Sequence, residues 1–143
     1  MGNATQWVKE LDCDLTSLDI NFDLAKSKRE QEIIFASFFA NGFVEYLDYL
    51  NDSTRYEYYL GSSIALNYCL KNKSVKIENG VINWDNTDQV VDNLRTLQKT
   101  VSTILESGYK RDAKALSVKY YEDKFYKNLR REPQLPAFLR SLN

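Results

Sequence analysis

The sequence predicts a mainly α-helical fold: a compact bundle of about four long helices with one central β-hairpin, at about 74–84, between the second and third helices. Three observations predict it. Apolar residues recur at helical spacing along most of the chain, an Asn-Gly pair interrupts that pattern at 79–80, and 143 residues suit one domain. We therefore expect a single helical domain over 1–143, with 1–24 partly irregular and 133–143 forming a C-terminal tail or a short helix.

The first 24 residues are predicted to be partly irregular. Trp7, Val8 and Leu11 predict a short amphipathic turn or helix, and the acidic, punctuated stretch from Asp12 to Asp23 predicts a loop. This stretch lacks the glycine and the glutamate that an EF-hand loop needs at its sixth and twelfth positions.

The first long helix is expected to begin after Ser27. Ser27 and Glu30 have the spacing of a capping box, in which the hydroxyl accepts from the Glu30 amide and the carboxylate reaches back to the Ser27 amide. Apolar residues then repeat at helical spacing, which predicts the most buried helix of the fold: Phe35, Phe39, Phe43, Leu47 and Leu50.

A second helix is predicted over about 54–71, after a break and a new N-cap at 51–54. Its small residues at 61–63 offer a place where another helix can approach closely. The chain then changes period, and Asn79-Gly80 predicts a type I′ turn, which needs positive φ at both central residues. The resulting register pairs residue 77 with 82 and residue 75 with 84. It places an apolar face on the helices: Val75, Ile77, Ile82 and Trp84.

Two more helices are predicted after the hairpin. The third follows a cap at 85–88, has apolar residues in a 4-3-4-3 seam and ends at Gly108. That seam suits an internal core stripe, with a homodimer interface as the alternative: Val90, Leu94, Leu97, Val101 and Ile104. The fourth helix is predicted over about 110–131 and ends before Pro133.

The composition excludes several common classes of catalytic and metal site. The chain has no histidine, which removes Ser-His-Asp and Cys-His catalysis and the usual zinc and iron sites. Its five glycines never form a phosphate-binding loop. We therefore expect a protein that is not an enzyme and has no cofactor and no metal.

The two cysteines, Cys13 and Cys69, make no disulfide framework, and Cys69 lies in an apolar run where a buried, inert thiol is expected. No secretory signal and no membrane span is apparent, so the expected location is cytoplasmic and no membrane partner is predicted.

The basic, tyrosine-rich C-terminal helix is the candidate polyanion-binding element, because lysine and arginine with interleaved aromatics suit phosphate contact and base stacking. The residues proposed for it are Lys124, Lys127, Arg130 and Arg131. Cations at a helix end also favour the helix dipole, which explains much of this pattern without a ligand.

The apolar tail is the candidate partner-binding element. Its bulky residues either fold back on the core or enter a groove of a partner protein: Phe138, Leu139 and Leu142. The predicted function is therefore a non-enzymatic protein that binds another macromolecule, most simply a protein, as an inhibitor, immunity protein, adaptor or assembly factor. Tyrosines, which are enriched at interfaces, number ten. The alternative is a nucleic-acid-binding accessory protein.

Overall fold

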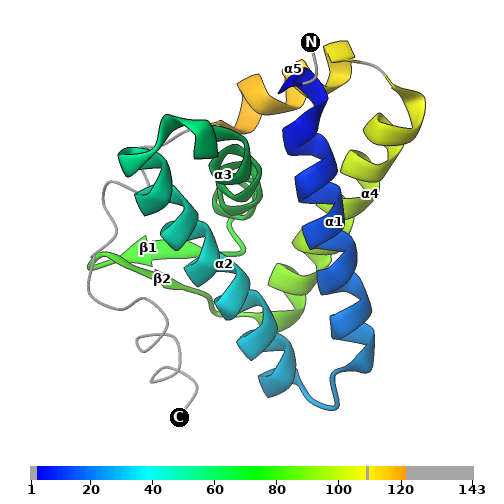
Figure 1. Ribbon diagram of the computed structural model, residues 1–143. Coiled ribbons are helices and arrows are strands. Elements are labelled where there is room, and N and C mark those ends of the chain that lie inside the picture. Colours follow the sequence, from blue (N-terminus) through cyan, green and yellow to red (C-terminus); the bar gives the residue numbers. More distant parts are fainter. Residues whose placement is uncertain (1–2, 109, 122–143) are drawn as a thin grey trace.

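The computed structural model describes residues 3–108 and 110–121. This part contains five α-helices, a short 3-10 turn (η1) and one antiparallel hairpin between the third and fourth helices (Figure 1). The elements are, in order, α1 (Asn3–Leu24), α2 (Lys28–Asn51), η1 (Ser53–Arg55), α3 (Tyr56–Lys71), β1 (Lys76–Glu78), β2 (Val81–Asn83), α4 (Thr87–Ser107) and α5 (Lys110–Tyr120). The predicted mainly helical fold with a central hairpin is confirmed, with one long helix more than expected.

The additional helix is α1, so the predicted loop over 12–23 is wrong. Six apolar side chains of α1 recur at helical spacing and are all buried: Trp7, Val8, Leu11, Leu15, Leu18 and Phe22. They pack α1 against α4 and α3. Two of the acidic residues between them have a cationic partner on α4, because the Arg95 guanidinium lies 2.9 Å from Asp19 and 2.6 Å from Asp23. The acids mark the outer face of an amphipathic helix.

The cap of α2 is confirmed with one change of partner. The Ser27 hydroxyl accepts from the Glu30 backbone N–H at 3.2 Å. The Glu30 carboxylate, however, accepts from the backbone N–H of Lys26 at 2.6 Å, one residue before the predicted donor. The box still satisfies two backbone donors at the helix start.

The small-residue patch of α3 lies where α1 and α3 approach each other, as predicted. A Cβ atom on Gly61 would lie 3.4 Å from Leu11 Cβ and 3.6 Å from the Trp7 carbonyl oxygen. Every residue from 59 to 67 is buried, so α3 is the central helix of the bundle. It is more buried than α2, so the prediction that α2 is the most buried helix is wrong. The predicted start at residue 54 is corrected slightly, since Asp52 caps η1 first and α3 begins at Tyr56.

The hairpin has the predicted register, with Ile77 opposite Ile82 and Glu78 opposite Val81. Asn79 and Gly80 both have positive φ, at 54° and 77°. The apolar face is held against α2, because the Trp84 ring meets the Phe35 ring edge-on, with centroids 4.9 Å apart. A lone hairpin is marginal in water, and this contact supplies the support it needs.

Helix α4 begins at a cap in which Asn86 accepts from the Gln89 N–H, and it ends at Gly108, whose φ is 69°. Four of the five seam residues are fully buried inside the domain, where α4 packs against α1: Val90, Leu94, Leu97 and Val101. The internal interpretation of this seam is therefore confirmed. Within the described ranges, no helix combines the length and apolar character that a membrane span requires.

Candidate functional site

The site residues predicted from the sequence lie outside the described residues. This holds for the apolar tail set Phe138, Leu139 and Leu142, and for the basic set Lys124, Lys127, Arg130 and Arg131. Of the predicted fourth helix, the structure describes residues 110–121, in which α5 ends at Tyr120.

Tyr120, at the start of the basic C-terminal region, is a buried aromatic residue. Tyr120 is only 8% exposed, and its ring packs on the Tyr68 ring with centroids 5.1 Å apart. The ammonium groups of Lys71 and Lys119 lie 5.5 and 5.3 Å from the centroid of that ring. Tyr120 is therefore a core residue with cations over it, and it offers no free face on which a base could stack.

A cluster of tyrosines lies where the end of α2 meets the start of α3 and the end of α5. Tyr49 and Tyr59 are stacked, with centroids 4.9 Å apart and an interplanar angle of 8°. Tyr56 packs on Tyr49 at 5.6 Å, and Tyr121 contacts both Tyr56 and Tyr59, at 6.3 and 6.2 Å. Three of these side chains reach the surface and form what we call the tyrosine surface: Tyr49, Tyr56 and Tyr121.

The tyrosine surface rests on buried, closely packed side chains. Tyr59 beneath it is fully buried, and Tyr46 packs on Tyr59 at 5.4 Å. The end of α5 is fixed against α3, because the buried Asn67 amide donates to the Tyr120 carbonyl at 2.6 Å. The Tyr121 N–H donates to the Ser117 carbonyl at 2.7 Å. Buried groups of α3 therefore determine where Tyr121 lies.

The tyrosine surface has apolar neighbours along the chain. Tyr56 and Tyr121 are 38% and 37% exposed. Leu50, directly after Tyr49, is 53% exposed, and Val118, one helical turn before Tyr121, is 73% exposed. Single exposed apolar residues are ordinary, but aromatic rings that contact one another at a surface are typical of binding sites.

The Tyr56 phenol of this surface is neutral near pH 7. Burial raises the pKa of Tyr56 above its usual 10.0, and the neighbouring Tyr121 and Tyr49 raise it further. A neutral phenol offers an apolar ring face together with one hydroxyl that can donate or accept a hydrogen bond. This combination suits a partner surface that is partly apolar and partly polar.

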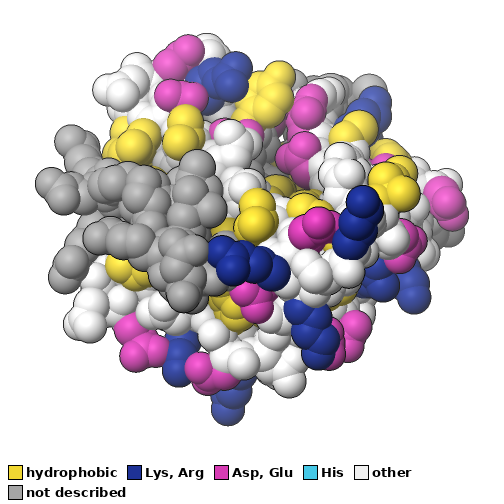
Figure 2. Space-filling view, turned by 90° about the horizontal axis from the view of Figure 1, so that it is seen from below, with side chains coloured by type: hydrophobic (Ala, Val, Ile, Leu, Met, Phe, Trp, Pro, Cys, Tyr) yellow, Lys and Arg dark blue, Asp and Glu magenta, His cyan; other side chains and the backbone are white. Residues whose placement is uncertain are grey.

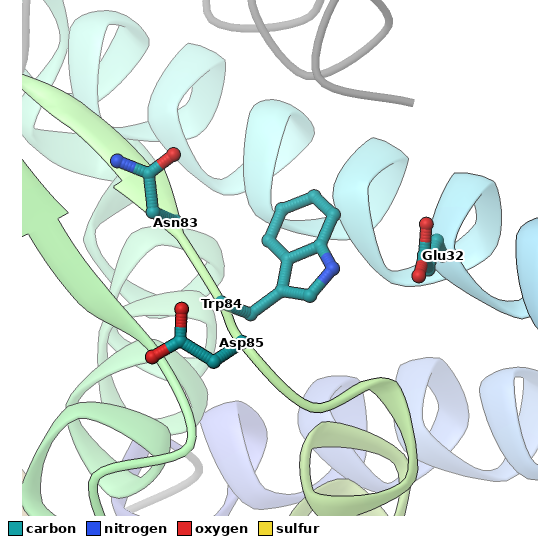
Figure 3. A pocket seen from close by; sticks show the side chains of 4 residues that line it. All are labelled: Glu32, Asn83, Trp84 and Asp85. Atoms are coloured by element: carbon teal, nitrogen blue, oxygen red, sulfur yellow. The ribbon is translucent and has the colours of Figure 1, made fainter. Parts of the chain in front are cut away.

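A small polar pocket lies between α2 and the hairpin and is lined by Glu32, Asn83, Trp84 and Asp85, with a volume of about 200 Å³ (Figure 3). The Trp84 ring lies between the two carboxylate side chains, and that of Asp85 points away from Glu32. Glu32 accepts from the Thr87 hydroxyl, and Asp85 pairs with the Lys76 ammonium at 3.1 Å. Each carboxylate thus has a structural partner, and the two do not converge on a common point.

A half-buried carboxylate, Glu45, lies on α2 beside α3 and near Asp14 of α1. Glu45 accepts from the Ser62 hydroxyl at 2.6 Å and from the Asn41 amide at 3.2 Å. Burial raises the pKa of Glu45; the hydrogen bond from Ser62 opposes that rise, and the negative charge of Asp14 adds to it. The hydrogen bond with Ser62 ties α2 to α3, whereas the bond from Asn41 lies within α2. In the ranges 3–108 and 110–121, no three side chains of the metal-ligating acidic or sulfur types gather as a metal site.

Charge is interspersed rather than gathered on the face shown in Figure 2, where lysines and arginines alternate with aspartates and glutamates. The net charge of the chain is −1. That face therefore shows no continuous basic stripe of the kind that follows a nucleic-acid backbone.

Sequence reasoning missed the tyrosine surface. It counted ten tyrosines as a sign of an interface but named none of them as a site residue. A usable signal was the density of tyrosines on either side of the break at 51–54, since Tyr46, Tyr49, Tyr56 and Tyr59 all lie within fourteen residues. The contribution of Tyr121 comes from the tertiary fold. In comparisons with known proteins, no family model, no curated protein and no solved structure matches the chain.

Proposed function

We propose that this chain is a non-enzymatic protein-binding domain and that the tyrosine surface is its recognition site. The observation that carries the proposal is the contact between Tyr56 and Tyr121, two rings that are each more than one-third exposed and come from separate helical regions. Tyrosine is enriched in interfaces and among the residues that dominate their binding energy. The cytoplasmic location expected from the sequence is part of the same proposal.

Rigidity supports this assignment. A side chain that is ordered before binding loses less conformational entropy when the complex forms. The stack of Tyr49 on the buried Tyr59, and the hydrogen bond from Asn67 to the Tyr120 carbonyl, hold the exposed rings in place before any partner arrives. The tail residues Phe138, Leu139 and Leu142 remain a predicted second element of recognition.

The test is affinity capture from a lysate of the encoding organism, with the full chain as bait and nuclease present. We expect a protein to be retained by the parent chain and lost with the double variant Tyr56→Ala/Tyr121→Ala. Tyr58→Ala is the matched control, because Tyr58 is 39% exposed but lies under the Arg55 guanidinium, 4.4 Å from it. Equal capture by the parent chain and a folded double variant would remove the tyrosine surface from the proposal.

The nucleic-acid alternative is tested by titrating a labelled duplex and a labelled single strand at several salt concentrations. Contacts to phosphates give a binding constant that falls steeply with salt. The protein-binding proposal predicts no binding even at low salt. Salt-sensitive binding that is lost with Lys127→Ala/Arg130→Ala/Arg131→Ala would favour the basic C-terminal region instead.

A further inference from the structure

A second surface lies where α3 ends and β1 begins, away from the stacked tyrosines. It is a shallow trough of about 390 Å³ that combines three aliphatic and three lysine side chains. We call it the lysine trough, and its lining residues are Leu70, Lys71, Lys73, Val75, Lys76 and Ile77. Aliphatic carbon and positive charge thus occur together in one short stretch of chain.

The backbone of this corner is fixed by buried partners. The Ser74 backbone N–H donates to the Cys69 carbonyl at 3.0 Å, and the buried Ser74 hydroxyl donates to the same oxygen at 3.2 Å. Lys73 has a φ of 62°, which is uncommon for a residue other than glycine, asparagine or aspartate. A lysine therefore occupies a turn position where glycine costs less, and its side chain is presented from an ordered corner.

Two of the three lysine charges have no carboxylate partner among residues 3–108 and 110–121. The Lys76 ammonium forms ion pairs with Glu78 and Asp85, each at 3.1 Å. The Lys71 ammonium donates to the Lys119 carbonyl at 2.5 Å, which satisfies one N–H and leaves its charge in place. Throughout the described part of the chain, no carboxylate forms an ion pair with Lys71 or Lys73. The rim of the trough is therefore positive.

The strand beside the trough has an open edge. The sheet consists of β1 and β2 alone in the described residues, so the outer side of β1 carries no further strand there. Glu78 and Val81 flank the two-residue turn and form a hydrogen-bonded pair, which makes Ile77 and Ile82 the next, non-hydrogen-bonded pair. The backbone N–H and carbonyl of Ile77 consequently point away from β2, toward the outer edge.

These features fit a peptide in extended conformation. A strand added beside β1 would pair with the Ile77 backbone, and every second side chain would face the trough. The floor accepts aliphatic side chains, and the positive rim complements carboxylates. A nucleic acid fits less well, because the lining is aliphatic and bases stack on aromatic rings.

We propose that the lysine trough binds an extended acidic segment of a partner protein, with alternating carboxylate and aliphatic side chains, as a third strand beside β1. This inference rests on the proposed protein-binding function but uses a separate surface. The trough adds a second point of contact and defines the chemistry of the segment that fits it.

The test is a backbone-amide NMR titration of the isotope-labelled full chain. The probe is a capped synthetic hexapeptide of alternating glutamate and valine, and the control probe replaces every glutamate with lysine. We expect saturable shifts at the amides of Leu70, Lys73 and Ile77 with the acidic peptide alone, weakened by added salt. Equal shifts with both peptides, or none at these amides, would overturn the proposal; the lysines would then only guard an exposed strand edge.

Charge variants identify the rim. Because two exposed ion pairs together contribute about tenfold in affinity, Lys71→Glu/Lys73→Glu should weaken acidic-peptide binding by about that factor or more. Lys71→Gln/Lys73→Asn is a second variant that keeps a residue suited to positive φ at position 73. Lys99→Glu on the exposed side of α4 is the matched control and should bind as the parent chain does. Unchanged affinity in both folded double variants would contradict the assignment.

Two further arms separate this inference from its alternatives. The first is a titration with a single-stranded oligonucleotide. If it shifts the same amides at a lower concentration than the acidic peptide does, the trough binds polyanions and the peptide proposal is wrong. Tyr56→Ala/Tyr121→Ala should leave the peptide titration unchanged, because the tyrosine surface is distinct from the trough. The lysine variants therefore test the trough proposal alone, whereas the capture experiment tests the tyrosine surface alone.

Discussion

The Asn67 side-chain amide donates to the Tyr120 backbone carbonyl at 2.6 Å, inside the core and across 53 residues of sequence. The same amide lies 3.2 Å from the Ser63 hydroxyl, one turn earlier on α3. This buried polar connection fixes the end of α5 on the central helix. It also sets the position of Tyr121, which follows directly and belongs to the tyrosine surface.

Replacing Asn67 with alanine should lower the free energy of unfolding by about 1–3 kcal/mol, because the Tyr120 carbonyl would lose its donor in a buried place. Asn72→Ala is the matched control. Its amide donates to the Tyr68 carbonyl at 2.8 Å but is exposed, so water can replace it and the expected change is below about 0.5 kcal/mol. Urea unfolding of both variants gives the comparison, and equal losses would mean that the Asn67 bond has no special structural role.

Glu45 should make stability depend on pH. Burial raises the pKa of this carboxyl above 4.5, so the folded state binds a proton more tightly than the unfolded state does. The contribution of protonated Glu45 to the free energy of unfolding is complete at a pH below its pKa in the unfolded state. It is lost as the pH rises through its pKa in the folded state. Glu45→Gln, which keeps an acceptor for the Ser62 hydroxyl, should therefore be more stable than the parent chain at neutral pH and equal to it at acid pH.

Urea unfolding at the two pH values measures this effect. Asp48→Asn, on the exposed side of the same helix, is the control for the removal of one carboxylate from α2. A parent chain that is more stable than Glu45→Gln at neutral pH would show that the charged carboxylate strengthens the contact with Ser62.

The two thiols should differ sharply in reactivity. Cys69 is fully buried, and burial raises its pKa to about 12, so almost no thiolate forms at neutral pH. Cys13 is exposed. A thiol reagent should label Cys13 in the native protein and reach Cys69 only after unfolding. Cys13→Ser should therefore show no native labelling, and rapid labelling of this variant would mean that the α3 core opens readily.

Local signals predicted several elements to within a residue. The Asn79-Gly80 turn determined the hairpin register, and Ser27 and Gly108 marked helix ends, because each depends on backbone conformation or hydrogen bonds within a few residues. The wrong prediction of a loop over 12–23 has a different origin. Asp19 and Asp23 suggested a loop, whereas their partner Arg95 lies more than seventy residues later, so the tertiary contact is invisible locally.

The candidate site was less predictable than the fold. Tyr49 and Tyr56 are close in sequence, but Tyr121 joins them through the packing of α5 on α3. The trough combines a helix end, a left-handed lysine and a strand edge, which come together through the fold of one corner. The predicted residues Phe138 and Arg131 lie outside the described residues, so their roles stay predictions.

The central claim is that the tyrosine surface binds a protein, and the most direct measurement is calorimetric titration of the captured partner into the parent chain and three variants. A central pair of aromatic contacts should contribute about 2 kcal/mol or more, so Tyr56→Ala/Tyr121→Ala should weaken binding by about thirtyfold. Tyr58→Ala should change the Kd by less than about threefold, as peripheral contacts do. Tyr49→Phe, which keeps the stack on Tyr59, should fall between them. A folded double variant with the Kd of the parent chain would contradict the claim.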